Sequence, residues 1–125
     1  MKQKVLVVDD DSNIRFVLCG LLEDLGLEVK EAQNGREALE IWGQWKPALI
    51  LMDWSMPVMD GKAAIENIRS LEKENKTVIV ALSARTNETD RKEIMSSGAD
   101  RFLGKPYREK EMVNLLGDYL EFSAW

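Results

Sequence analysis

The stretch from Ala48 to Gly61, ALILMDWSMPVMDG, decides how the rest of the sequence is interpreted. Five apolar residues, Ala48–Met52, end in an acid, Asp53, and turn-forming residues follow. A short apolar run that is bounded by turn signals predicts a strand buried on both faces, as in parallel sheets. A carboxylate at the end of such a strand is costly unless it is paired or metal-bound. We therefore expect other parts of the chain to supply partners for Asp53.

Composition limits the class of protein. The 125 residues, 45% hydrophobic and 31% charged, predict a single globular domain over residues 1–125 with a core of about residues 4–120. The net charge of −5 argues against nucleic acid as a direct partner, since phosphate binding favours a basic surface. Cys19 is the only cysteine, which excludes a disulfide framework and favours a cytoplasmic location.

Two further absences in the sequence limit the expected location of the protein and the chemistry that it can perform. The N-terminus has no signal-peptide pattern and no apolar run approaches the roughly 20 residues of a membrane helix, so we expect no membrane contact. The chain has no histidine, which excludes a histidine general base, Ser-His-Asp and Cys-His catalysis, and a phosphohistidine on this chain.

Apolar runs alternate with amphipathic segments along the whole chain. Predicted strands cover residues 4–8, 28–32, 48–52, 77–82 and 101–104. Predicted helices lie between residues 12 and 26, 34 and 47, 61 and 72, 87 and 98, and 109 and 120. Ser12 is the expected cap of the first helix, and Leu71 is expected to face the core. The pattern predicts an α/β fold of five βα units, a doubly wound parallel sheet with helices on both faces.

Polar side chains follow four of the five predicted strands: Asp9, Asp10, Asp53, Ser83 and Lys105. Ligands of such sheets bind at the carboxyl ends of the strands, so these residues are expected to form one site. One lysine and one divalent cation balance three carboxylates, and oxygen donors alone favour Mg²⁺ or Mn²⁺. A carboxylate, a lysine, a hydroxyl and such a cation suit phosphoryl transfer to an aspartate.

The motifs VVDD, LMDWSMPVMDG, ALSA and FLGKPY, in this order, closely resemble the receiver domain of two-component response regulators. The resemblance extends from Lys4 to about Leu120. It implies a flavodoxin-like, five-stranded parallel sheet in the order 2-1-3-4-5. It also implies a phosphoacceptor switch rather than an enzyme that acts on free substrates.

The resemblance assigns the acceptor and the metal ligands. Asp53 is implied to be the phosphoacceptor. Asp10 would bind Mg²⁺ directly and Asp9 mainly through water, while the backbone carbonyl of Ser55 would be the third protein ligand beside Asp53. Asp11 is expected to belong to the start of the first helix rather than to the site.

The resemblance also assigns a switch. The hydroxyl of Ser83 would bind the phosphoryl group and move inward, and Phe102 would swing in behind it. Lys105 would pair with the phosphoryl group, and the Lys105–Pro106 peptide bond is implied to be cis. The surface formed by residues 87–120 is expected to change on phosphorylation.

The implied donor is the phosphohistidine of a histidine kinase or a histidine phosphotransfer protein. The expected docking residues are Ile14, Val17, Pro106 and Tyr107, with Phe16 as a further exposed candidate. The protein itself is expected to be a monomer or a weak dimer linked to phosphorylation. The stretch from Ala81 to Met112 resembles receivers of hybrid sensor kinases, and a free-standing regulator is the alternative.

Two other functions fit part of the pattern. A Mg²⁺-dependent phosphohydrolase could use Asp53 as a nucleophile, but such enzymes carry a second acid two residues later, where this chain has Ser55. A flavin-binding module of similar architecture lacks its phosphate-binding loop here, because acids follow the first predicted strand.

Overall fold

The computed structural model describes residues 2–73 and 76–122, which form alternating strands and helices. In chain order the elements are β1 (Lys4–Val8), α1 (Ser12–Asp24), β2 (Glu28–Ala32), α2 (Gly35–Trp45), β3 (Leu49–Asp53), α3 (Gly61–Leu71), β4 (Val78–Ser83), α4 (Glu88–Ser96), β5 (Arg101–Gly104) and α5 (Glu109–Gly117). All neighbouring strands are parallel, in the order β2-β1-β3-β4-β5. The fold class that the sequence predicted and the strand order that the resemblance implied are therefore confirmed.

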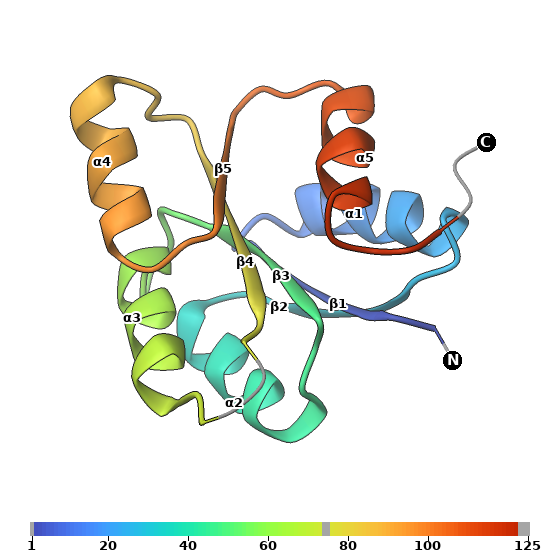
Figure 1. The fold of residues 1–125 in the computed structure, drawn as a ribbon, viewed down its shortest axis with the longest axis horizontal. Coiled ribbons are helices and arrows are strands. Elements are labelled where there is room, and N and C mark those ends of the chain that lie inside the picture. Colours follow the sequence, from blue (N-terminus) through green and yellow to red (C-terminus); the bar gives the residue numbers. More distant parts are fainter. Residues whose placement is uncertain (1, 74–75, 123–125) are drawn as a thin grey trace.

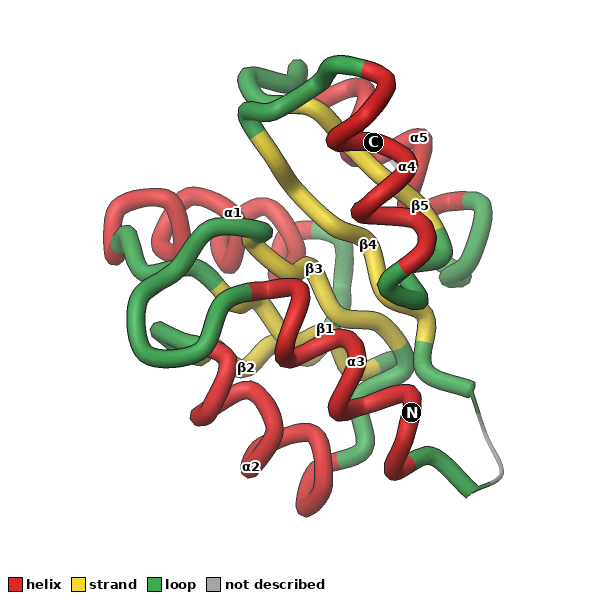
Figure 2. The backbone as a smooth tube through the Cα atoms, turned by 90° about the vertical axis from the view of Figure 1, so that its left-hand side faces the viewer, coloured by secondary structure: helices red, strands yellow, loops and turns green. Residues whose placement is uncertain are grey.

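The helices form one layer on each face of the sheet. Helices α1 and α5 cover one face, and α2, α3 and α4 cover the other (Figures 1 and 2). The central strand β3 is buried at all five positions, including Ile50 and Leu51, whose side chains point to opposite faces. Each of these buried side chains contributes about 2 kcal/mol to the stability of the fold, and β3 has such side chains on both faces of the sheet. The strand therefore packs against both helix layers.

Aspartates cap the first residues of α1 and α3, and the cap of α1 differs from the prediction. Asp11, rather than Ser12, caps α1, because its carboxylate accepts hydrogen bonds from the backbone N–H groups of Asn13 and Ile14. Both residues are short and polar, so the sequence pattern did not distinguish them. Asp60 caps α3, because its carboxylate accepts a hydrogen bond from the Ala63 N–H, and it thereby ends the loop after β3.

The end of α5 and the exposure of the last residue of α3 also differ from the prediction. Helix α5 ends at Gly117 rather than near Leu120, although Leu120 is buried beyond the helix. Leu71, the last residue of α3, is 58% exposed rather than part of the core. It lies at the amino-terminal edge of the sheet, beyond the residues that α3 packs against the strands. None of the described helices is long and apolar enough to cross a membrane.

Candidate functional site

The acids that follow β1 and β3 converge at the carboxyl edge of the sheet. Strands β1 and β3 are adjacent and in register from Val5–Leu49 to Val8–Met52, so the residues after them lie side by side. Carboxylate oxygens of Asp9, Asp10 and Asp53 lie within 4.8 Å of one another. The predicted acidic cluster is thus present, with two buried members and one exposed member, Asp10.

Lys105 reaches this cluster from the end of β5. Its Nζ atom lies 3.0 Å from Asp53 Oδ1 and 3.4 Å from Asp9 Oδ2. The backbone holds Lys105 in place, since its N–H donates to the carbonyl of Ser83. The peptide bond to Pro106 is cis, as the resemblance implied. A single lysine therefore contacts both buried carboxylates.

Burial and charge shift the pKa values in the cluster. Asp53 is 5% exposed, and its burial raises the pKa of its carboxyl group; the neighbouring charges of Asp9 and Asp10 raise it further, while Lys105 lowers it. Burial alone would lower the pKa of Lys105, but its hydrogen bond to Asp53 and the charges of Asp53 and Asp9 outweigh this and raise it. The lysine is therefore charged, and it compensates only part of the negative charge around it.

Three carboxylates and one lysine leave a formal charge of −2 at this edge. All ligand atoms on offer are oxygens, close enough to share one ion. A hard divalent cation such as Mg²⁺ or Mn²⁺ matches both the charge and the donor type. The residues present therefore fit the predicted metal.

The loop after β3 fixes the direction of Asp53. The Trp54 N–H donates to the Leu82 carbonyl at 2.9 Å, and the Gly61 N–H donates to the Trp54 carbonyl at 3.0 Å. A Cβ atom on Gly61 would lie 2.3 Å from the Asp53 carbonyl oxygen, so only glycine allows this approach. Ser55 lies in the same loop, exposed and two residues after Asp53.

The predicted switch residues lie on the two strands beside β3. Ser83 is buried at the end of β4, and its Oγ accepts a hydrogen bond of 3.0 Å from the Arg85 N–H. Phe102 is half-buried on β5, paired with Ala81, and the guanidinium of Arg91 on α4 lies 5.3 Å from its ring centroid. Both residues therefore lie close to the acidic edge, on the side of α4.

The predicted docking residues are only partly brought together. Val17 and Tyr107 line a groove of about 800 Å³ between α1 and α5, together with Phe16. Phe16 and Val17 are 79% and 70% exposed. Ile14 instead packs against the core beneath α1, and Pro106 is exposed but does not line the groove.

Arg15 is a residue of this edge that the sequence did not suggest. Its guanidinium donates to the backbone carbonyl of Asp9 at 2.7 Å and pairs with Glu31 on β2, also at 2.7 Å. It therefore ties the turn after β1 to the edge strand. Cys19, on the same helix, takes no part in the site, and burial raises the pKa of its thiol to about 11.

The strand order and the acidic edge together define a flavodoxin-like α/β domain with a cluster suited to a hard cation. Comparison with known proteins places this domain more narrowly. Residues 5–117 match the response regulator receiver domain family, so the chain belongs to that family.

One curated relative shows how much of a longer protein such a domain can represent. The transcriptional regulatory protein SrrA of Staphylococcus aureus is 39% identical over 113 residues. The match covers 90% of this chain and 46% of SrrA. The chain therefore spans less than half the length of the curated relatives it matches.

Solved structures from three organisms share the fold. The Vibrio cholerae chemotaxis protein CheY4 is 32% identical, with a TM-score of 0.89 over 96% of this chain and 100% of CheY4. The receiver domain of the sensor histidine kinase PA1611 from Pseudomonas aeruginosa, solved with a magnesium ion in its active-site cleft, is 29% identical with a TM-score of 0.86, covering 95% and 98% of the two chains. A co-crystal structure of the Saccharomyces cerevisiae histidine phosphotransfer protein Ypd1 with the receiver domain of Ssk1 contains a match of 29% identity and TM-score 0.88, covering 94% and 88%.

Proposed function

We propose that Asp53 accepts a phosphoryl group from a phosphohistidine of a histidine kinase or a histidine phosphotransfer protein. The observation that carries this proposal is the convergence of Asp53, Asp9, Asp10 and Lys105 at one edge of the sheet. The co-crystal of Ypd1 with the Ssk1 receiver supports the second kind of donor, and the PA1611 receiver supports a place within a sensor kinase.

The carboxylates of Asp9, Asp10 and Asp53 and the backbone carbonyl of Ser55 would hold Mg²⁺ or Mn²⁺. When bound, the cation supplies charge neutralisation between the acids and the incoming phosphoryl oxygens. Asp9, which accepts a hydrogen bond from the Asp11 N–H at 2.9 Å, keeps a fixed orientation for this role.

The transfer itself forms one bond and breaks one. A carboxylate oxygen of Asp53 bonds to phosphorus as the phosphorus–nitrogen bond of the donor breaks, and the electron pair of that bond stays on the imidazole nitrogen. Lys105 Nζ, 3.0 Å from Asp53 Oδ1, lies where it can balance the charge of the transferred group. Positioning and charge stabilisation of this kind account for most of the catalysis of phosphoryl transfer.

Ser83 and Phe102 would then report the modification. The Ser83 hydroxyl can leave its contact with the Arg85 N–H and donate to a phosphoryl oxygen on Asp53. Phe102 can follow into the space behind it and leave its contact with Arg91. The surface around α4, β5 and α5 is therefore the proposed output of the switch.

The groove between α1 and α5 is the proposed docking site of the phosphodonor. Its exposed apolar residues, Phe16 and Val17, lie on the helix that begins directly after the acids of β1. Tyr107 continues the groove from the loop that carries Lys105. This surface fits the amphipathic helices of a phosphotransfer partner.

The protein would act as a switch rather than as a hydrolase of free substrates. Ser55 supplies no carboxyl group as a general acid beside Asp53. A monomer or a weak dimer linked to phosphorylation, and a cytoplasmic location, remain predictions from the sequence.

The test is phosphorylation by acetyl phosphate in the presence of Mg²⁺. Acid-labile phosphate should appear on the protein, and beryllofluoride with Mg²⁺ should quench the fluorescence of Trp54, which directly follows Asp53. Steady release of phosphate from p-nitrophenyl phosphate, without a labelled protein, would favour the hydrolase. No labelling and no fluorescence change would contradict the proposed switch.

A further inference from the structure

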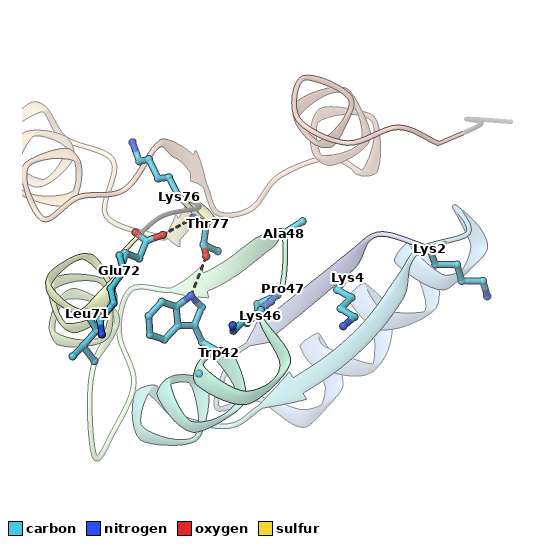
Figure 3. A pocket seen from close by; sticks show the side chains of 12 residues that line it. Lys2, Lys4, Trp42, Lys46, Pro47, Ala48, Leu71, Glu72, Lys76 and Thr77 are labelled. Carbon is cyan, nitrogen blue, oxygen red and sulfur yellow. Dashed lines mark hydrogen bonds between the residues drawn. The ribbon is translucent and has the colours of Figure 1, made fainter.

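A second pocket lies at the opposite, amino-terminal edge of the sheet. It has a volume of about 870 Å³ (Figure 3). The residues that line it lie before and at the start of β1, at the end of α2 and before β3, at the end of α3 (residues 71–73), and directly before β4 (Lys76 and Thr77). Its size falls in the range of small-molecule sites. The acidic cluster takes no part in it, because its residues follow the carboxyl ends of the strands.

Lysines dominate the lining of this pocket. Five of the ten lysines of the chain line it: Lys2, Lys4, Lys46, Lys73 and Lys76. Among the lining residues that the structure describes, the only acid is Glu72, and both of its carboxylate oxygens accept hydrogen bonds. Arg69 donates to Oε1 and the Thr77 N–H donates to Oε2, each at 2.6 Å. The described lining residues therefore include five lysines and one acid, in a chain of net charge −5.

Ion pairs remove little of this charge. Lys76 pairs with Asp100 at 2.9 Å, and Figure 3 shows its side chain extending away from Trp42. Within residues 2–73 and 76–122, the other four lysines form no ion pair with a carboxylate. A cluster of like charges that the fold does not neutralise is suited to an anionic ligand.

Helix capping explains only one of these lysines by a direct contact. Cations near the ends of α2 and α3 stabilise the helix dipoles, and Lys4 Nζ donates to the Trp45 carbonyl at 3.3 Å. Lys46, however, is the C-cap of α2 with a φ of 53°, a conformation for which glycine is strongly preferred. Glycine would cap the helix at lower cost, so the cap does not require the lysine side chain.

Apolar surface lies among the lysines. Trp42 donates its Nε1–H to Thr77 Oγ1 at 2.9 Å, which fixes the indole ring in the pocket between Leu71 and Lys46 (Figure 3). Leu71 is exposed at the rim, although its neighbours on α3 face the core. A ring and a branched side chain therefore meet the cationic groups in one concave surface.

We propose that this pocket binds a nucleotide, with the base against Trp42 and Leu71 and the phosphates among Lys4, Lys46 and Lys73. Aromatic side chains stack bases, and lysine ammonium groups bind phosphates as point charges. The small concave surface and the acidic remainder of the chain favour a single nucleotide over a nucleic acid strand. The site is independent of the phosphoacceptor edge, so both can be occupied at the same time.

The experiment is a titration of the ¹⁵N-labelled full chain with ATP in the presence of EDTA, followed by nuclear magnetic resonance. The Trp42 Nε1–H signal is the local reporter, because this group is bonded to Thr77 within the pocket. We expect a saturable shift of this signal and of the backbone amides of the lining residues. Shifts that do not saturate, or that centre on the acidic edge, overturn the proposal.

Two charge-matched double variants test the role of the lysines. Lys46→Gln with Lys73→Gln should weaken ATP binding about tenfold, because the double variant removes two lysine–phosphate contacts that each contribute a few-fold to the affinity. Lys92→Gln with Lys110→Gln removes the same charge from α4 and α5 and should leave the affinity within about twofold. Equal weakening by both pairs would show general charge attraction and overturn the site.

Three further measurements distinguish the class of ligand from the role of the fold. Inorganic triphosphate should bind more weakly than ATP. Equal binding would show that the pocket is a general anion site and would overturn the proposal that it binds a nucleotide. A glutamate-rich peptide that binds the pocket as tightly as ATP would also overturn this proposal. Lys46→Gly should raise the melting temperature by relieving the strained cap and still weaken ATP binding; unchanged binding would exclude Lys46 from the site.

Discussion

The two edges of the sheet treat charge in opposite ways. At the carboxyl edge, Asp9 and Asp53 are nearly fully buried and are held by one lysine. At the amino edge, five lysines line a pocket, and the one acid among its described lining residues accepts hydrogen bonds from Arg69 and a backbone N–H. The first edge leaves negative charge that a cation can balance, whereas the second leaves positive charge that an anion can balance. The acidic site and the lysine-lined pocket thus lie at opposite ends of the strands of one parallel sheet.

The same contrast appears in two aspartates. Burial and neighbouring acids raise the pKa of Asp53. Burial acts on Asp100 in the same direction, but hydrogen bonds from Lys76 and the Ile79 N–H, with the charge of Arg69, outweigh it and lower its pKa. Asp100 therefore stabilises the fold in its charged form, whereas the charged form of Asp53 lowers the stability of the fold.

The largest expected effect is that of Asp53→Asn. The amide keeps the shape of the side chain but cannot form the acyl phosphate, so labelling by acetyl phosphate should fall below detection. Without Mg²⁺ the variant should also be more stable to urea than the wild type, because a buried charge beside Asp9 and Asp10 is removed. Lys92→Gln, on the outer surface of α4, should label normally. Wild-type labelling of Asp53→Asn would assign the acceptor to another residue.

Lys105→Met should lower the rate of phosphorylation about 100-fold, since it removes one preorganised charge from the transfer. It also leaves Asp53 and Asp9 buried without a cation, which should destabilise the protein by about 2 kcal/mol in the absence of Mg²⁺. Added Mg²⁺ should recover more stability in this variant than in the wild type. Urea unfolding with and without Mg²⁺ measures this difference, and Lys110→Met is the control. An equal Mg²⁺ effect in both proteins would contradict the shared role of lysine and cation.

Two glycines, one near each edge, separate a required glycine from a replaceable one. Gly61→Ala should destabilise the protein by about 2–3 kcal/mol, because its Cβ would meet the backbone of Asp53 and Trp54. Gly43→Ala, within α2, has nothing within 4 Å of the added Cβ and should stabilise it by about 0.5–1 kcal/mol. Thermal unfolding of both variants tests the comparison, which fails if the two changes have the same sign.

Asp100→Asn should cost about 2 kcal/mol at pH 7, through weaker contacts with Arg69, Lys76 and the Ile79 N–H. Because the folded-state pKa of Asp100 is lowered, its contribution is fully present above the unfolded value of 3.8 and is lost as the pH falls through the folded value. The difference from the wild type should stay constant from about pH 7 to pH 5 and shrink below about pH 4. A difference that grows on acidification would reverse the assigned sign.

The acidic edge could be predicted from the sequence because a parallel sheet aligns its strand ends. The apolar runs predict parallel strands, and in such a sheet Asp9, Asp53 and Lys105 must approach one another, although 96 residues separate the first from the last. The strand order itself came from the resemblance, since periodicity contains no information on which strands are neighbours.

Other contacts could not be predicted, because they depend on side chains that meet only in the folded chain. Arg15 has no local pattern that points to the Asp9 carbonyl. The lysines of the second pocket are spread over about 75 residues, and each alone resembles an ordinary surface lysine. Leu71 fits the helical spacing of a core residue, but the helix extends past the edge of the sheet at this point. Spacing thus describes a face of a helix and not how far the core extends beneath it.

The late position of Lys105 in the chain has a consequence for protein synthesis. The three carboxylates emerge from the ribosome within the first 53 residues, long before the lysine that holds two of them. Strand β5, which places Lys105, is the edge strand beside β4 and is short, with four half-buried residues. Until it pairs, a growing chain carries the acids without their lysine. We therefore expect a chain that ends before β5 to accept a phosphoryl group far more slowly than a chain that includes Lys105.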